Sequence, residues 1–100
     1  MVQVTAQQIQ DWKEKYGDCI YKIPLATGES YYVRTPKIKE LEAAQPLLQN
    51  GRPISYNISL FTVCYLGGDE IPKHDEMKLS AVAGKMMETI ETIEAGLEKV

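Results

Sequence analysis

The stretch CIYKIPLATGESYYVRT, residues 19–35, decides the fold. Its two apolar parts, residues 19–25 and 30–34, are rich in β-branched and aromatic side chains, which favour strands. The residues between them are typical of a turn, because Gly28 can adopt a positive φ. The stretch therefore predicts a β-hairpin. Pro24 has no N–H, so its donor side must face away from the partner strand.

A helix is predicted before the hairpin, over residues 6–16. Thr5 and Gln8 have the spacing of a capping box, and Gly17 suits the position after the last helical turn. A lone hairpin is marginally stable in water, so we expect it to pack on helices. The apolar stripe of this first helix is Ile9, Trp12 and Tyr16.

A second helix is predicted after the hairpin. Thr35 is expected to cap it and Pro36 to occupy its first turn, where the missing N–H costs nothing. Pro46 either kinks this helix or begins a second short turn, and Asn50-Gly51 ends it. The predicted buried side holds Ile38, Leu41 and Leu48.

The segment PISYNISLFTVCYL, residues 53–66, is compatible with a strand or a helix. Its residue types and the alternation at its start favour a strand. Its length favours a helix, since fourteen residues is long for a strand in a small domain. Pro53 at the start and Gly67-Gly68 after the end are also typical of a helix, which is the structure we predict.

A long amphipathic helix is predicted from about residue 75 to residue 99. Such a helix would be roughly 36 Å long, whereas a compact domain of this size has a radius of gyration near 13 Å. Part of the stripe is therefore expected to project from the domain. The stripe consists of Leu79, Val82, Met86, Ile90, Ile93, Leu97 and Val100.

These elements predict one small α+β domain spanning residues 1–100. It would contain an N-terminal helix, a two-stranded antiparallel hairpin, and two to three helices ending in the long C-terminal helix. The predicted core consists of Ile9, Trp12, Tyr21, Ile23, Val33, Ile38, Leu41, Ile58, Phe61, Val82, Met86 and Ile90.

Composition excludes several classes of function. The chain carries 11 basic and 14 acidic residues, a formal net charge of −3, so we expect no nucleic-acid partner. No apolar run approaches the roughly 18 residues of a membrane helix, and the N-terminus lacks the features of a signal peptide. We therefore expect a cytoplasmic protein without a membrane partner. Cys19 and Cys64 are interpreted as small buried apolar residues.

The only histidine, His74, lies in an acidic loop, residues 69–76. The loop is interpreted as a solvated segment whose Asp75 and Glu76 stabilise the start of the last helix. An enzyme or a metal protein built around His74 is the alternative. The ligand spacing of known metal motifs is absent, and so are the patterns of nucleophilic enzymes. We therefore expect no catalytic residue, metal or cofactor.

Two short motifs carry a resemblance to a known family. The hairpin leads into RTPKIKELEAAQ, and the middle apolar segment ends in SLFTVCYLGGDE. In this order, before an apolar C-terminal helix, they resemble the tail assembly chaperones of tailed bacteriophages and prophages over residues 18–98. The N-terminal helix with Trp12 is outside that pattern, and the frameshifted extension of many such proteins is missing. The resemblance implies a non-enzymatic chaperone of the bacterial cytoplasm that binds the tape-measure protein and recruits tail-tube subunits.

The C-terminal stripe is the predicted partner-binding surface. It is longer than a small core can cover, and an uncovered stripe would be a large exposed apolar patch. A homodimer is expected when no client is bound, because two-fold association lets identical stripes cover each other. The alternative function is a small oligomeric regulatory or adaptor module using the same helix. The predicted partner-binding residues are Met86, Ile90, Ile93 and Leu97.

Overall fold

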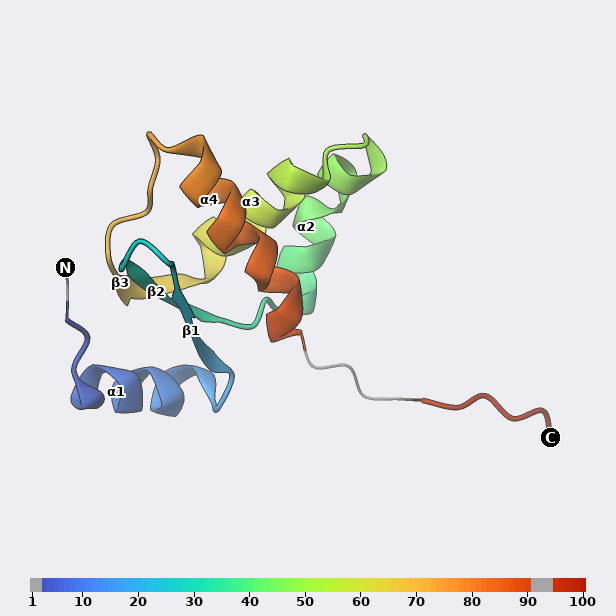
Figure 1. The fold of residues 1–100 in the computed structure, drawn as a ribbon. Coiled ribbons are helices and arrows are strands. Elements are labelled where there is room, and N and C mark those ends of the chain that lie inside the picture. Colours follow the sequence, from blue (N-terminus) through green and yellow to red (C-terminus); the bar gives the residue numbers. More distant parts are fainter. Residues whose placement is uncertain (1–2, 91–94) are drawn as a thin grey trace.

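The computed structural model describes residues 3–90 and 95–100 and has the predicted α+β fold (Figure 1). A small antiparallel sheet separates one peripheral helix from a group of packed helices. The elements are α1 (Ala6–Tyr16), β1 (Ile20–Pro24), β2 (Ser30–Arg34), α2 (Ile38–Gln49), α3 (Pro53–Cys64), β3 (Tyr65–Gly68), α4 (Glu76–Ala83) and the 3₁₀ helix η1 (Gly84–Thr89).

The sheet has three strands in the order β1-β2-β3, so the prediction of a two-stranded ribbon is wrong. The hairpin itself is confirmed, with Tyr21 opposite Val33 and Gly28 at a φ of 105°. The third strand is made by the diglycine that was interpreted as a helix stop. Tyr31 pairs with Gly68 and Tyr32 with Gly67, and the register shifts between Tyr32 and Val33.

One face of the sheet forms the main core with α3, α4 and η1. Tyr31, Val33 and Phe61 are completely or almost completely buried there, and the Tyr31 and Phe61 rings meet edge to face at 5.9 Å. The predicted helix at residues 53–66 is confirmed over Pro53–Cys64, with Pro53 in its first turn. Five residues of the predicted core are confirmed as buried, namely Ile23, Val33, Phe61, Val82 and Met86.

The rest of the predicted core is less buried. Tyr21 and Ile38 are 37% and 73% exposed, so their assignment to the core is wrong. Ile38 is exposed because α2 starts two residues later than predicted, with Lys37 rather than Thr35 at the N-cap. That shift turns Ile38 outward and places Pro36 in the interior. The half-buried members are Ile9, Trp12, Leu41, Ile58 and Ile90.

The predicted long C-terminal helix is wrong for the described residues 95–100, and its α-helical part ends at Ala83. Helix α4 starts at the predicted place, where the Asp75 carboxylate accepts a hydrogen bond from the Lys78 N–H (3.0 Å). After Ala83 the chain tightens into η1, and a 3₁₀ helix has three residues per turn. Ala83, Met86 and Thr89 are therefore on one buried face, and Thr89 takes the core position predicted for Ile90. Residues 95–100 have no regular secondary structure.

Helix α1 lies on the opposite face of the sheet (Figure 1). The predicted capping box is confirmed, since Thr5 Oγ1 accepts from the Gln8 N–H (3.2 Å) and Gln8 Oε1 accepts from the Thr5 N–H (2.9 Å). The Trp12 ring is 5.7 Å from the Tyr32 ring, and it covers Gly67 so closely that a Cβ there would meet it at 2.9 Å. No residue of α1 is fully buried.

Candidate functional site

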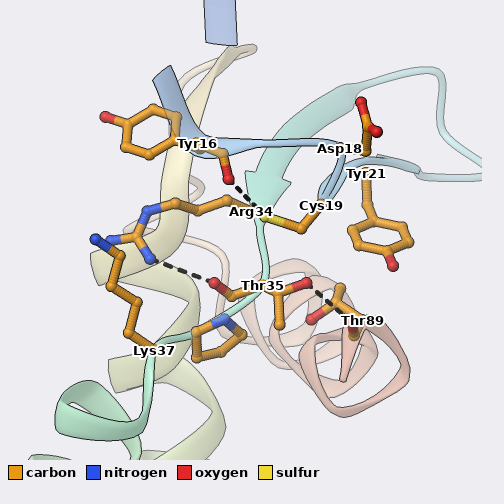
Figure 2. Close-up of a pocket in the computed structure, with 9 residues that line it drawn as sticks. Tyr16, Asp18, Cys19, Tyr21, Arg34, Thr35, Lys37 and Thr89 are labelled. Carbon is orange, nitrogen blue, oxygen red and sulfur yellow. Dashed lines mark hydrogen bonds between the residues drawn. The ribbon is translucent and has the colours of Figure 1, made fainter. Parts of the chain in front are cut away.

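Two hollows lie side by side along β1 and share Tyr21 and Thr89 in their linings. The larger has a volume of about 470 Å³ and is shown in Figure 2. The smaller, of about 330 Å³, continues along the strand. We call them together the β1 cleft. Its lining residues are Tyr16, Asp18, Cys19, Tyr21, Lys22, Ile23, Pro24, Arg34, Thr35, Pro36, Lys37, Lys85, Glu88 and Thr89.

One wall of the β1 cleft is β1 itself, an outer strand of the sheet. The N–H of Leu25 donates to the Glu29 carbonyl (2.8 Å) and the N–H of Thr35 donates to the Cys19 carbonyl (3.1 Å). Hydrogen-bonded pairs alternate along an antiparallel ladder, so Tyr21 and Ile23 also direct their backbone groups toward β2. The backbone groups of the residues between them, Ile20, Lys22 and Pro24, therefore point away from the sheet.

Tyr21 is a wall residue with an uncovered side chain. It lies on the same face of the sheet as Ile23 and directly opposite Val33, which is fully buried. Tyr21 is nevertheless 37% exposed. The helical layer therefore covers the core face of β2 and of β1 at Ile23, but leaves the same face partly open at Tyr21.

The opposite wall is the end of η1. The Thr35 hydroxyl donates to the Thr89 carbonyl (3.0 Å), which ties the end of η1 to the loop after β2 (Figure 2). The Thr89 hydroxyl donates to the Met86 carbonyl (2.7 Å) and stays buried. The first bond fixes the end of η1 relative to the loop after β2, and the second is internal to η1.

Arg34 of the Arg-Thr-Pro motif joins four elements at one end of the cleft. Its Nη1 and Nη2 atoms donate to Glu40 Oε1 and Oε2, both at 2.7 Å, and its guanidinium carbon lies 5.4 Å from the centre of the Tyr16 ring. Nη2 also reaches the Val63 carbonyl at 3.5 Å. The hydrogen bond from Arg34 lowers the pKa of Glu40 to about 2. This fork is a structural joint between β2, α2, α3 and α1.

The charge of the cleft is basic, although the whole chain is acidic. Arg34 is neutralised by Glu40, and Lys85 is paired with Glu88 at 3.0 Å. Lys22 and Lys37 form no ion pair with any other residue that the structure describes. Asp18 is the remaining carboxylate, and it lies on the opposite side of the larger hollow from Arg34 and Lys37 (Figure 2).

The thiols and the histidine lie apart. Cys19 lines the β1 cleft and donates to the Tyr16 carbonyl (3.2 Å), whereas Cys64 is fully buried and burial raises its thiol pKa to about 11. His74 lines a different hollow, with Glu29 and Lys78. Within residues 3–90 and 95–100, no three His, Cys, Asp or Glu side chains are grouped so that they could hold a metal ion.

The Gly-Gly-Asp motif also has a structural role. The Ser30 N–H donates to Asp69 Oδ2 (2.8 Å), and the Asp69 N–H donates back to the Ser30 carbonyl (2.9 Å). The Tyr65 hydroxyl donates to the Asp69 carbonyl (2.7 Å). Both motifs of the family resemblance therefore hold β2, one at its start and one at its end.

The predicted partner-binding residues are not gathered on one surface. Met86 is fully buried in the core, so its assignment to a partner surface is wrong for this folded chain. Ile90 is half-buried, Leu97 is 100% exposed, and Ile93 lies outside the described residues. The prediction from sequence missed the β1 cleft, although Pro24 in a strand already signalled an edge without a partner.

Comparisons with protein families, with curated proteins and with solved structures each found no match for this chain. Within the part of the chain that the structure describes, every helix is too short or too polar to cross a membrane.

Proposed function

We propose that this chain is a non-enzymatic assembly chaperone of the phage tail type, which binds tape-measure and tail-tube proteins in the bacterial cytoplasm. The observation that carries the proposal is the placement of its two motifs. Arg34-Thr35-Pro36 and Gly67-Gly68-Asp69 are far apart in sequence and hold opposite ends of the same strand, β2. Their order, on which the resemblance rests, is therefore a feature of one folding unit.

The chemistry of the β1 cleft supports binding over catalysis. Its polar groups are backbone, two tyrosines, lysines, an arginine already engaged by Glu40, two carboxylates, the Cys19 thiol and two threonine hydroxyls, and it contains no histidine among the described residues. Nucleophilic catalysis needs a thiol or hydroxyl beside an activating base. Cys19 and His74 line separate hollows, so this cleft does not combine them.

The end of the chain supports a second contact with a partner. Leu97 is fully exposed, and Val100 is also fully exposed. Apolar side chains at helical spacing are typical of segments that lie in a groove of another protein. We retain Ile90, Ile93 and Leu97 as the partner-binding residues of this segment and leave Met86 out.

Co-expression tests the proposed function. The gene neighbours of this chain should encode tail proteins, and the tape-measure protein should co-elute with it in size-exclusion chromatography with light scattering. Leu97→Glu should weaken that complex at least about tenfold, whereas the matched control Lys99→Gln in the same exposed segment should leave it unchanged. Neighbours unrelated to tails, together with no complex, would overturn the proposal.

The exposed Leu97 and Val100 equally favour the adaptor function, in which copies of this chain associate. The same chromatography separates the two functions. An adaptor would form a homo-oligomer that dissociates in the Leu97→Glu variant, and it would not bind the tape-measure protein.

A further inference from the structure

We infer that the β1 cleft binds an extended, acidic segment of a partner protein, which pairs with the outer edge of β1 as a fourth strand. The inference rests on the proposed protein-binding function and names the mode of binding and the chemistry of the partner. It concerns the folded body and does not involve the C-terminal segment.

The outer edge of β1 presents backbone groups that could form such pairing. Ile20 and Lys22 direct an N–H and a carbonyl away from β2, and Pro24 directs a carbonyl. A partner strand lies about 4.8 Å from its neighbour and spans about 17 Å over five residues. The β1 cleft is lined by Cys19 and by four residues of β1, Tyr21 to Pro24, so it extends along most of the strand.

Side chains of the partner would complete the apolar layer. In an added strand every second side chain points to the core face of the sheet. On that face the partner's side chains would lie next to the exposed ring of Tyr21 and the end of η1 at Thr89. Such strand addition obtains affinity from main-chain hydrogen bonds and specificity from the pockets for alternate side chains.

Charge selects an acidic partner over a second copy of this chain. Lys22 and Lys37 have no ion-pair partner among the described residues, whereas Lys85 is paired with Glu88, so these two lysines outnumber the remaining carboxylate, Asp18. Carboxylates beside these lysines would be favoured in binding and in encounter rate. Pairing of β1 with β1 of another copy would bring the same basic side chains together, which opposes association. Pro24, a typical device against edge pairing, limits it further.

The test uses two fluorescein-labelled hexapeptides, Thr-Glu-Val-Glu-Val-Thr and Thr-Lys-Val-Lys-Val-Thr. The acidic peptide should bind at least about tenfold more tightly than the basic one, with a preference that falls as salt is added. Equal binding of the two peptides, or no binding of the acidic one, would overturn the inference.

Amide hydrogen exchange locates the bound peptide. The Ile20 and Lys22 amides should exchange at least about tenfold more slowly with the acidic peptide. The Tyr21 and Ile23 amides already face β2 and serve as the internal control. Bound peptide without protection of Ile20 and Lys22 would place it elsewhere and overturn the inference. Protection that grows with protein concentration alone would assign the edge to a second copy and also overturn it.

Two variants separate backbone pairing from charge. Lys22→Pro removes an outward N–H and leaves the bonds to β2 intact, so peptide binding should fall at least about tenfold. Lys22→Gln keeps the N–H and should weaken binding only about twofold to fivefold. If Lys22→Pro does not fold, the exchange experiment on the wild type decides. A chain that binds the tape-measure protein while its Lys22 amide stays unprotected would keep the proposed function and lose this inference.

Discussion

The two outer strands of the sheet differ in what stands next to them. Around β3, Trp12 lies against Gly67, and the Gly68 backbone approaches Ser30 so closely that a Cβ would meet its carbonyl oxygen at 2.5 Å. Along β1, by contrast, a hollow of about 330 Å³ separates the strand from η1, and Tyr21 is partly exposed. The strand β3 is therefore tightly packed against Trp12 and β2, whereas β1 borders a hollow.

The greatest loss of unfolding free energy is expected in the core beneath β2 and β3. Phe61 is fully buried, and its ring lies 5.9 Å from Tyr31 of β2 and 6.0 Å from Tyr65 of β3. Phe61→Ala should therefore lower the free energy of unfolding by about 3–5 kcal/mol, measured by urea denaturation followed by circular dichroism. The control is Val63→Ala on the same helix, which should cost less because Val63 is 50% exposed. Similar losses for both variants would contradict this description of the core.

The second effect tests the close contact between β3 and β2. Gly68 has a φ of 104° and no room for a Cβ, so Gly68→Ala should cost about 3 kcal/mol of unfolding free energy. Gly17 has a φ of 88° with nothing within 4 Å, so Gly17→Ala measures backbone strain alone, about 1–2 kcal/mol. If the two variants unfold at the same denaturant concentration, the close approach of β3 to Ser30 has no energetic consequence.

The third effect concerns the Arg34–Glu40 joint and depends on pH. The pKa of Glu40 is lowered from 4.5 to about 2 by the hydrogen bond from Arg34. The stabilisation it gives is complete above pH 4.5 and is lost as the pH falls toward about 2. Glu40→Gln should cost about 1–2 kcal/mol at pH 7, and the difference from the wild type should vanish near the acid end of this range.

The pH dependence of the Arg34–Glu40 joint must be measured relative to Glu40→Gln, because the Glu29 carboxyl titrates in the same pH range. Hydrogen bonds from Thr27 and Lys78 lower the pKa of Glu29 to about 2 as well. Urea denaturation at several pH values gives the difference between wild type and Glu40→Gln, in which Glu29 cancels. A difference that does not change between neutral and acid pH would show that the Glu40 charge does not stabilise the joint.

The smallest change in unfolding free energy is expected at the outer edge of β1. Lys22 directs its N–H away from β2, so Lys22→Pro should change the unfolding free energy by less than about 1 kcal/mol. Thermal unfolding followed by circular dichroism measures it. A loss as large as that of Gly68→Ala would show that the outer edge of β1 is already occupied, and the comparison between the two edges would fail.

Local patterns predicted most of the secondary structure. The capping box of Thr5 and Gln8 forms within one helical turn, and the hairpin turn at Gly28 needs only a positive φ. Pro53 at the start of α3 is equally local. Each of these signals depends on residues at most a few positions apart, so the sequence is enough to read them.

Two elements were mispredicted because their cause lies far along the chain. Tyr65–Gly68 has little strand propensity and becomes β3 through pairing with β2, held by Ser30 and Asp69. The C-terminal stripe has strong helical periodicity, yet η1 changes its winding so that Thr89 is buried and bonded to Thr35. The candidate site was missed for the same reason, since it lies between β1 and η1.

The α+β class, the hairpin, helices α1 and α3, the start of α4 and five buried core residues could all be predicted from the sequence. These follow from capping, turn residues and apolar spacing, which act over short distances. The third strand, the end of the last helix and the hollow beside β1 arise from packing between distant segments. Those features depend on which surfaces meet, and the free energy of burying a surface is set by its neighbours in space and not by its neighbours in sequence.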